Sequence, residues 1–272
     1  MAGVYCVDSI GLRLTNITAP TLDAASLLLP EGAYTTLRTY ERHRLIGLSA
    51  HLQRLVDSFA LAHQDCPLDL PRIRAALRTI LDAEALPAAR LRITTPFDSD
   101  RVFVCIEPFE AYPPECYTRG VRCVTTRLLR EMPRAKLTAF ITLSRAAKAE
   151  EGREVQELLL VDTEGRILEG LSSNFFAVLN ETLCTAGGGV LEGVTRGLVL
   201  AEAQGVVPVN LSPVRLADLP DLTEAFITSS SRDVMPVAQI DHVTIGSSCP
   251  GPITQQLMER YWASLAQAAE KP

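Results

Sequence analysis

Leu158-Leu-Leu-Val-Asp-Thr-Glu-Gly-Arg-Ile-Leu-Glu-Gly-Leu-Ser-Ser-Asn-Phe-Phe-Ala-Val178 is the segment with the clearest pattern in the chain. It predicts an apolar strand, a turn at residues 163–165, and a second strand that carries Glu169 and Asn174. A carboxylate inside an otherwise apolar strand is costly to bury unless a cation pairs with it. We therefore expect Glu169 to have a cationic partner inside the protein, and a protonated pyridine ring is one such partner. The alternative is a glutamate at a strand edge that faces water.

The composition describes an ordinary globular protein of 272 residues, 47% hydrophobic and 21% charged. A net charge of −6 argues against nucleic acid as a partner. We expect no membrane partner either, because no apolar run approaches the ~20 residues that span a bilayer, and no signal peptide is apparent.

Seven cysteines without a Cys-x-x-Cys pair favour reduced thiols in a cytoplasm. The four histidines show no metal-ligand spacing, so we expect no metal site.

The order of predicted elements indicates an α+β protein of two domains. Helical spacing of apolar residues is found at 52–62, 71–85, 139–149, 195–204 and 253–269, and hairpin patterns at 90–106 and 158–178. The stretch Tyr112–Gly120 is rich in Pro and Gly and is the best linker candidate. We therefore expect an N-terminal α/β domain over 1–116 and a C-terminal domain over 117–272.

Lysine is scarce: the chain contains Lys136, Lys148 and Lys271 only. Lys148 and Lys271 lie in polar surroundings, whereas Lys136 has an apolar flank that favours a neutral, nucleophilic amine. A surface lysine is the alternative interpretation of Lys136.

The pattern Glu169-Gly170-x-x-x-Asn174-x-Phe176 resembles the signature of the class IV (fold-type IV) pyridoxal-phosphate aminotransferases. This family includes branched-chain and D-amino-acid aminotransferases and aminodeoxychorismate lyase. The resemblance covers most of the chain, and Lys136 precedes Glu169 by 33 residues, similar to the family's spacing.

The resemblance implies a two-domain enzyme with a smaller N-terminal α/β domain and a larger C-terminal mixed-sheet domain that binds pyridoxal 5′-phosphate. It also implies a homodimer acting on a small-molecule amino donor and a 2-keto acid. Lys136 would form the Schiff base and move the proton at the substrate's α-carbon. Glu169, with Asn174 beside it in the signature, would hydrogen-bond the pyridine nitrogen and keep it protonated.

Three segments suit the cofactor's phosphate. Val194 and Thr195 lie where a helix begins, and backbone N–H groups there can bind an anion; they resemble the family's Gly-Ile-Thr-Arg turn. Ser229 and Ser230 follow a predicted strand and fall at a Gly-Thr pair of the family. Arg54, within a run similar to the family's His-Leu-x-Arg-Leu, would reach the phosphate with its planar fork. A plain helix cap, a serine-rich loop and a solvated arginine are the alternatives.

The substrate pocket is expected to involve Tyr34, Arg38 and Arg92. Tyr34 and Arg38 flank a Thr-Thr run that resembles aminodeoxychorismate lyases, and Arg92 lies near an arginine of branched-chain enzymes. Ile141 stands where branched-chain enzymes carry a tyrosine that contacts the cofactor.

Transamination is therefore the predicted reaction, and pyruvate-releasing aminodeoxychorismate lyase is the alternative. A non-catalytic relative and a hydrolase using a serine at 229–231 are weaker alternatives, and the hydrolase lacks a Gly-x-Ser-x-Gly elbow.

Overall fold

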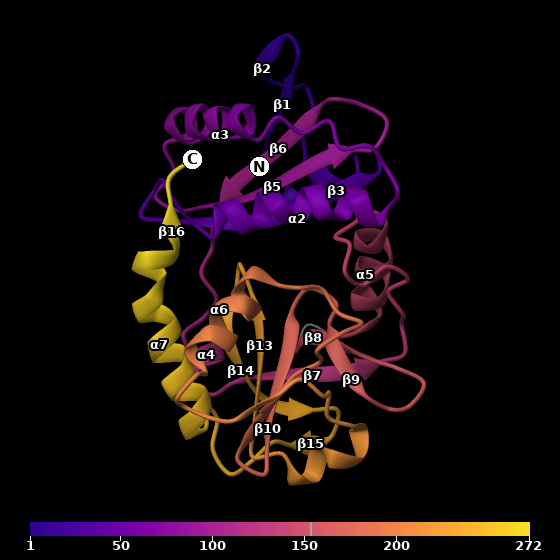
Figure 1. The fold of residues 1–272 in the computed structure, drawn as a ribbon, viewed down its shortest axis with the longest axis vertical. Helices are drawn as coiled ribbons and strands as arrows, with labels where there is room; N and C mark the ends of the chain where they lie inside the picture. The colour runs from indigo at the N-terminus through magenta and orange to yellow at the C-terminus, as the bar shows by residue number, and fades with distance from the viewer. Residues whose placement is uncertain (153) are drawn as a thin grey trace. The chain divides into compact units, whose positions relative to one another are not determined.

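The chain divides into two compact units. The computed structural model describes residues 1–152 and 154–272 (Figure 1). Unit 1 consists of Met1–Glu110, Arg134–Leu143 and Gln267–Pro272, and unit 2 consists of Ala111–Pro133 and Ser144–Ala266. The sequence predicted a single boundary after residue 116, whereas two later segments pack with the first part of the chain. One of them, 134–143, carries Lys136 into unit 1.

Unit 1 is built on a seven-stranded antiparallel sheet with the order β16-β4-β3-β5-β6-β1-β2. Its strands are β1 (Gly3–Asp8), β2 (Gly11–Leu14), β3 (Gly32–Tyr40), β4 (Arg44–Ile46), β5 (Ala89–Pro96), β6 (Val102–Pro108) and β16 (Ala269–Glu270). Its helices are α1 (Leu22–Ser26), α2 (Leu48–Leu61) and α3 (Leu70–Glu84).

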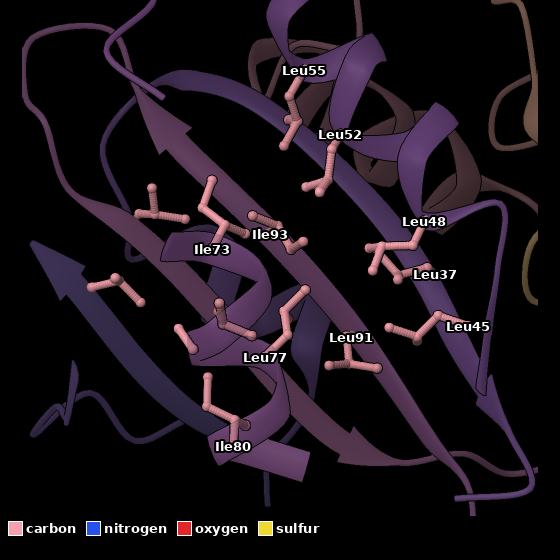
Figure 2. Close-up of a cluster of buried hydrophobic side chains, with 14 of the residues drawn as sticks. Leu37, Leu45, Leu48, Leu52, Leu55, Ile73, Leu77, Ile80, Leu91 and Ile93 are labelled. Atoms are coloured by element: carbon pink, nitrogen blue, oxygen red, sulfur yellow. The ribbon is translucent and has the colours of Figure 1, made fainter. Parts of the chain in front are cut away.

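Helices α2 and α3 bury their apolar faces against one face of this sheet. The side chain of Asp69 accepts a hydrogen bond from the Arg72 N–H and caps α3, and Ala85 ends the helix in a left-handed conformation. Leucines and isoleucines at helical spacing on both helices meet alternate residues of β3 and β5, as Figure 2 shows for Leu48 beside Leu37. Both helices were predicted from that spacing.

Unit 2 contains a nine-stranded sheet in which β9 pairs with both β8 and β10. This double pairing closes β10-β13-β14-β7-β8-β9 into a barrel-like ring, and the pair that closes it is Asn174 opposite Glu169. β7 runs parallel to β8 and β14, so the sheet is mixed. The strands are β7 (Val121–Thr126), β8 (Val155–Val161), β9 (Ile167–Gly170), β10 (Asn174–Leu179), β11 (Thr182–Cys184), β12 (Val209–Asn210), β13 (Glu224–Ser229), β14 (Asp233–Ile240) and β15 (Val243–Thr244).

The remaining helices include those predicted in the second half of the chain. They are α4 (Glu115–Thr118), α5 (Ala139–Glu150), α6 (Val194–Glu202), the 3-10 helix η1 (Leu216–Asp221) and α7 (Pro252–Ala268). None of the helices in the described part of the chain combines the length and apolar character that crossing a bilayer requires.

Candidate functional site

Glu169 lies on β9 in unit 2, with only 2% of its surface exposed. Arg130 Nη1 donates a hydrogen bond to its Oε1 at 2.9 Å, while Asn174 Nδ2 and the Leu191 N–H donate to Oε2 at 3.3 and 3.0 Å. Charged hydrogen bonds of this kind compensate the burial of a carboxylate. The sequence predicted a cationic partner but missed Arg130. It lies 39 residues away, and no local pattern marks it.

Asn174 connects this carboxylate to the start of helix α6. Its Nδ2 also donates to the Leu191 carbonyl at 2.7 Å. A Cβ on Gly193, the N-cap residue of α6, would lie 2.1 Å from Asn174 Oδ1, so any other residue here would displace the Asn174 side chain. Gly193 has no side chain with which to cap the helix, and the first N–H groups of α6, at Val194 and Thr195, are of the kind that binds an anion.

The end of strand β13 carries Thr228, followed by Ser229 and Ser230. Thr228 is paired with Asn174, which is itself paired with Glu169, and directly paired residues of antiparallel strands share a face of the sheet. Thr228 is 1% exposed, and its Oγ1 has no hydrogen-bond partner among the described residues. Unit 2 thus places Glu169, Asn174 and the Thr228 hydroxyl on one face of the sheet. The half-buried Ser229 and Ser230 follow Thr228 directly in the sequence.

Lys136 lies in unit 1, where its backbone is held from two sides. Its N–H donates to Ser58 Oγ on α2 at 3.0 Å, and its carbonyl accepts from the Tyr34 N–H on β3 at 2.9 Å. Lys136 Nζ lies 4.7 Å from the centroid of the Tyr34 ring. The backbone of the lysine is therefore fixed, while its partly buried side chain extends toward an aromatic face.

Arg54 belongs to a hydrogen-bonded group on the α2 side of the unit 1 sheet. Its Nη2 donates to Thr35 Oγ1 at 2.8 Å, and Thr35 Oγ1 lies 2.7 Å from His51 Nδ1. Burial, together with the charges of Arg54 and Lys136, holds the pKa of His51 well below its ordinary value. A neutral His51 can accept the Thr35 proton at Nδ1, which leaves Thr35 Oγ1 free to accept from Arg54. The sequence singled out Arg54 but not these two supports.

Arg92, predicted for the substrate pocket, lies on β5 with partners for all of its guanidinium nitrogens. Nε donates to Thr36 at 3.0 Å, Nη1 to Ser26 at 2.7 Å and Nη2 to Asp23 at 2.7 Å. Its Cζ also lies 5.0 Å from the centroid of the Tyr34 ring. These contacts fix Arg92 within unit 1.

Arg38 and Tyr34 occupy the same strand, β3. The Arg38 guanidinium packs on two rings, with its Cζ 4.2 Å from the Tyr40 centroid and 4.3 Å from the Phe109 centroid. Tyr34 contacts both Lys136 and Arg92 with its ring. Of the three predicted substrate residues, Tyr34 is therefore the one beside the lysine.

Residues 32–240 match the family model described as amino-transferase class IV. The chain belongs to the class IV aminotransferases. It is 26% identical over 259 residues to the branched-chain-amino-acid aminotransferase of Pseudomonas aeruginosa, covering 85% of this chain and 83% of that protein.

Two solved structures show that this class IV aminotransferase has the predicted fold-type IV architecture. The T.th. branched-chain amino acid aminotransferase with pyridoxamine 5′-phosphate superimposes with a TM-score of 0.81 at 22% identity, covering 98% of this chain and 94% of that one. The branched-chain aminotransferase of Thermoproteus uzoniensis with norvaline has a TM-score of 0.79 at 25% identity, covering 98% and 95%.

Class IV aminotransferases use pyridoxal 5′-phosphate, so the predictions of cofactor and of transaminase chemistry are confirmed. The residues of unit 2 fit this cofactor. A buried carboxylate suits a protonated ring nitrogen, and the start of α6 suits a phosphate. The Thr228 hydroxyl, which has no partner among the described residues, lies on the strand position paired with Asn174.

Proposed function

We propose that this aminotransferase moves the amino group of an apolar amino acid to a 2-keto acid, with Lys136 and Glu169 as its principal residues. The observation that carries the proposal is the buried Glu169 carboxylate. Arg130 donates a hydrogen bond to one of its oxygens, and Asn174 and the Leu191 N–H donate to the other. Bound pyridoxal phosphate supplies an electron-accepting ring that stabilises negative charge at the α-carbon of the substrate.

Glu169 would accept a hydrogen bond from the pyridine nitrogen and keep the proton there. Arg130 and Asn174 fix its two oxygens, so the carboxylate does not need to reorient when charge develops on the ring. Asn174 acts by orienting Glu169 and by contacting the start of α6 through Gly193.

Lys136 would hold the cofactor through Nζ, and the same amine would move the proton at the substrate's α-carbon. Two backbone hydrogen bonds fix its main chain, so the side chain alone provides the movement that the proton transfer requires. The face of the Tyr34 ring, whose centroid lies 4.7 Å from Nζ, attracts the ammonium and helps to position it.

The phosphate is bound by two groups of donors. One group is the N–H groups of Val194 and Thr195 with Ser229 and Ser230, and the other is the guanidinium of Arg54. The support for the first group is the uncapped helix start. The support for Arg54 is its fixed orientation on Thr35.

The amino donor is an aliphatic amino acid of the branched-chain type. Two observations support this substrate class. Branched-chain aminotransferases are among the proteins that match most of the chain, and Tyr34 offers an apolar ring beside Lys136. Arg38 and Arg92 are held by neighbours in unit 1, which favours a structural role for both over substrate binding. The Thr35-Thr36 run keeps aminodeoxychorismate lyase as the second candidate, although both hydroxyls serve internal arginines.

The test is a visible absorption titration of the purified enzyme with single amino acids. Leucine, isoleucine or valine should convert the lysine-bound form of the cofactor to its amine form, and 2-ketoglutarate should reverse the change. Conversion by D-alanine alone would contradict the proposed donor class. Release of pyruvate from aminodeoxychorismate, with no spectral change from any aliphatic donor, would establish the lyase instead.

We also propose that the enzyme is a cytoplasmic homodimer. The odd set of seven cysteines without paired spacing supports a reducing compartment, and the family resemblance supports the dimer. Light scattering of the holoenzyme should give twice the chain mass of 29.6 kDa, and a monomeric mass would contradict the dimer.

A further inference from the structure

A second buried ion pair lies in unit 2, apart from the pair that Glu169 forms with Arg130. Glu157 on β8 is 0% exposed, and Arg232, immediately before β14, is 6% exposed. Arg232 Nη1 donates to Glu157 Oε2 at 2.8 Å. Buried pairs of this kind persist where further hydrogen bonds satisfy both partners, so their other contacts indicate what the pair holds in place.

The Glu157 carboxylate holds the turn between Glu169 and Asn174 in place through hydrogen bonds. Its Oε2 accepts from the Ser172 N–H at 3.2 Å, from Ser172 Oγ at 2.7 Å and from Ser173 Oγ at 3.0 Å. Arg232 Nη1 also donates to Ser172 Oγ, at 3.0 Å. These two serines immediately precede Asn174, so the pair fixes the connection that closes the ring of strands.

Close packing at Gly170, where the turn begins, holds the turn against Glu157 as well. A Cβ on Gly170 would lie 2.7 Å from Glu157 Cγ and 2.3 Å from Ser173 Oγ. The chain therefore comes directly onto the Glu157 side chain immediately after Glu169, and any other residue at this position would displace it.

The backbone of Arg232 holds the loop that carries the serines proposed to bind phosphate. Its N–H donates to both the Ser229 carbonyl and Ser229 Oγ at 3.2 Å, and Tyr117 Oη donates to its carbonyl at 3.2 Å. One residue therefore contacts the β13–β14 loop through its main chain and the β9–β10 turn through its guanidinium.

Both partners are charged in the folded protein. Burial opposes ionisation of Glu157, but Arg232 and the Ser172 hydroxyl outweigh it and lower the Glu157 pKa below its ordinary value. Burial also opposes the charge on Arg232, and Glu157 and Tyr112 reverse that effect and raise the Arg232 pKa.

We propose that Arg232 and Glu157 are positioning residues that fix the Ser229–Ser230 loop relative to Glu169 and Asn174, and thereby set how strongly the enzyme holds the phosphate end of its cofactor. The inference rests on the proposed role of Ser229 and Ser230 in phosphate binding. The proposal predicts that loss of Arg232 weakens binding of pyridoxal phosphate more than binding of pyridoxal, which lacks the phosphate. A general loss of stability would weaken both equally.

The experiment compares binding of pyridoxal phosphate and of pyridoxal, which lacks the phosphate, to the apoenzyme. In Arg232→Lys the charge is kept and the planar fork is lost, and affinity for pyridoxal phosphate should fall roughly 10- to 100-fold, the effect of one charged hydrogen bond. Affinity for pyridoxal should change less than about threefold. Because a single neutralisation can unfold the protein, the double variant Glu157→Gln/Arg232→Gln is the second test, with the same expected result.

Two controls make the outcome decisive. Arg166→Lys alters a partly exposed pair with Asp162 at the other end of the β8–β9 hairpin and should change neither affinity. Ser230→Asp places a negative charge in the loop itself and should abolish the preference for pyridoxal phosphate.

If Ser230→Asp removes that preference but both Arg232 variants retain it, or lower both affinities equally, the positioning role is wrong. If Ser230→Asp leaves the preference intact, the proposed phosphate site is wrong, and the inference falls with it.

Discussion

The residues around Lys136 in unit 1 and those around Glu169 in unit 2 stabilise the proposed functional side chains in different ways. In unit 2 the buried carboxylates Glu169 and Glu157 each form an ion pair with an arginine. In unit 1 the contacts of Arg54 and of the Lys136 backbone include neutral groups, namely Thr35, Ser58 and the peptide of Tyr34. Ion pairs suit a carboxylate that must remain charged on rigid strands. Backbone hydrogen bonds suit a lysine whose side chain must move.

This difference predicts that losing a support is more damaging in unit 2 than in unit 1. Removing one partner of a buried ion pair leaves an uncompensated charge and costs about 3–5 kcal/mol. Removing one neutral hydrogen bond costs about 0.5–1.5 kcal/mol. Substitutions of the individual supports test this ranking, beginning with the largest effect.

Arg130→Met should lower the free energy of unfolding by about 3–5 kcal/mol, because Glu169 loses its ion pair. The double variant Arg130→Met/Glu169→Gln should recover much of the loss, since the buried charge is then removed as well. Urea unfolding of the apoenzymes measures both. A loss below about 1 kcal/mol in the single variant would show that the pair does not behave as buried.

Thr35→Val should weaken binding of pyridoxal phosphate roughly tenfold, because Arg54 loses the hydroxyl that orients it. Thr95→Val is the matched control. Thr95 is buried on the neighbouring strand β5, and its Oγ1 has no partner among the described residues, so the change should leave affinity unaltered. Equal affinities in the two variants would show that Thr35 does not orient Arg54 for phosphate binding.

We expect the low pKa of His51, in unit 1, to make the free energy of unfolding depend on pH. Its folded-state pKa lies well below 6.5, whereas in the unfolded chain it takes a proton as pH falls through that value. Its contribution is therefore fully present above pH 6.5 and is lost below it, by up to about 1.4 kcal/mol per pH unit. Unfolding of His51→Asn, measured from pH 7 to 5, should show a shallower decline than the wild-type protein, and identical slopes would show that His51 titrates normally.

Local patterns were enough to predict most of the longer elements and to single out candidate functional residues. The 3.6-residue spacing located α3 and α7, and a carboxylate in an apolar strand required the partner that Arg130 provides. The scarcity of lysine singled out Lys136. Each of these signals lies within one short segment of the sequence.

The supports of the site could not be predicted because strand register brings them together. Arg232 and Glu157 are 75 residues apart, and alone each resembles a surface residue. Segment 134–143 joins unit 1 through the bridge between Ala33 and Leu137, for which neither residue gives a signal. The unsatisfied Thr228 hydroxyl likewise becomes visible only once β13 is paired with β10.

The most direct test of the Lys136 assignment reduces the holoenzyme with borohydride, digests it, and locates the pyridoxyl group by mass spectrometry. We expect a single modified peptide containing Lys136, and no adduct in Lys136→Ala reconstituted with cofactor and treated in the same way. An adduct on Lys148 or Lys271, or a normal adduct in the Lys136→Ala protein, would contradict the central assignment.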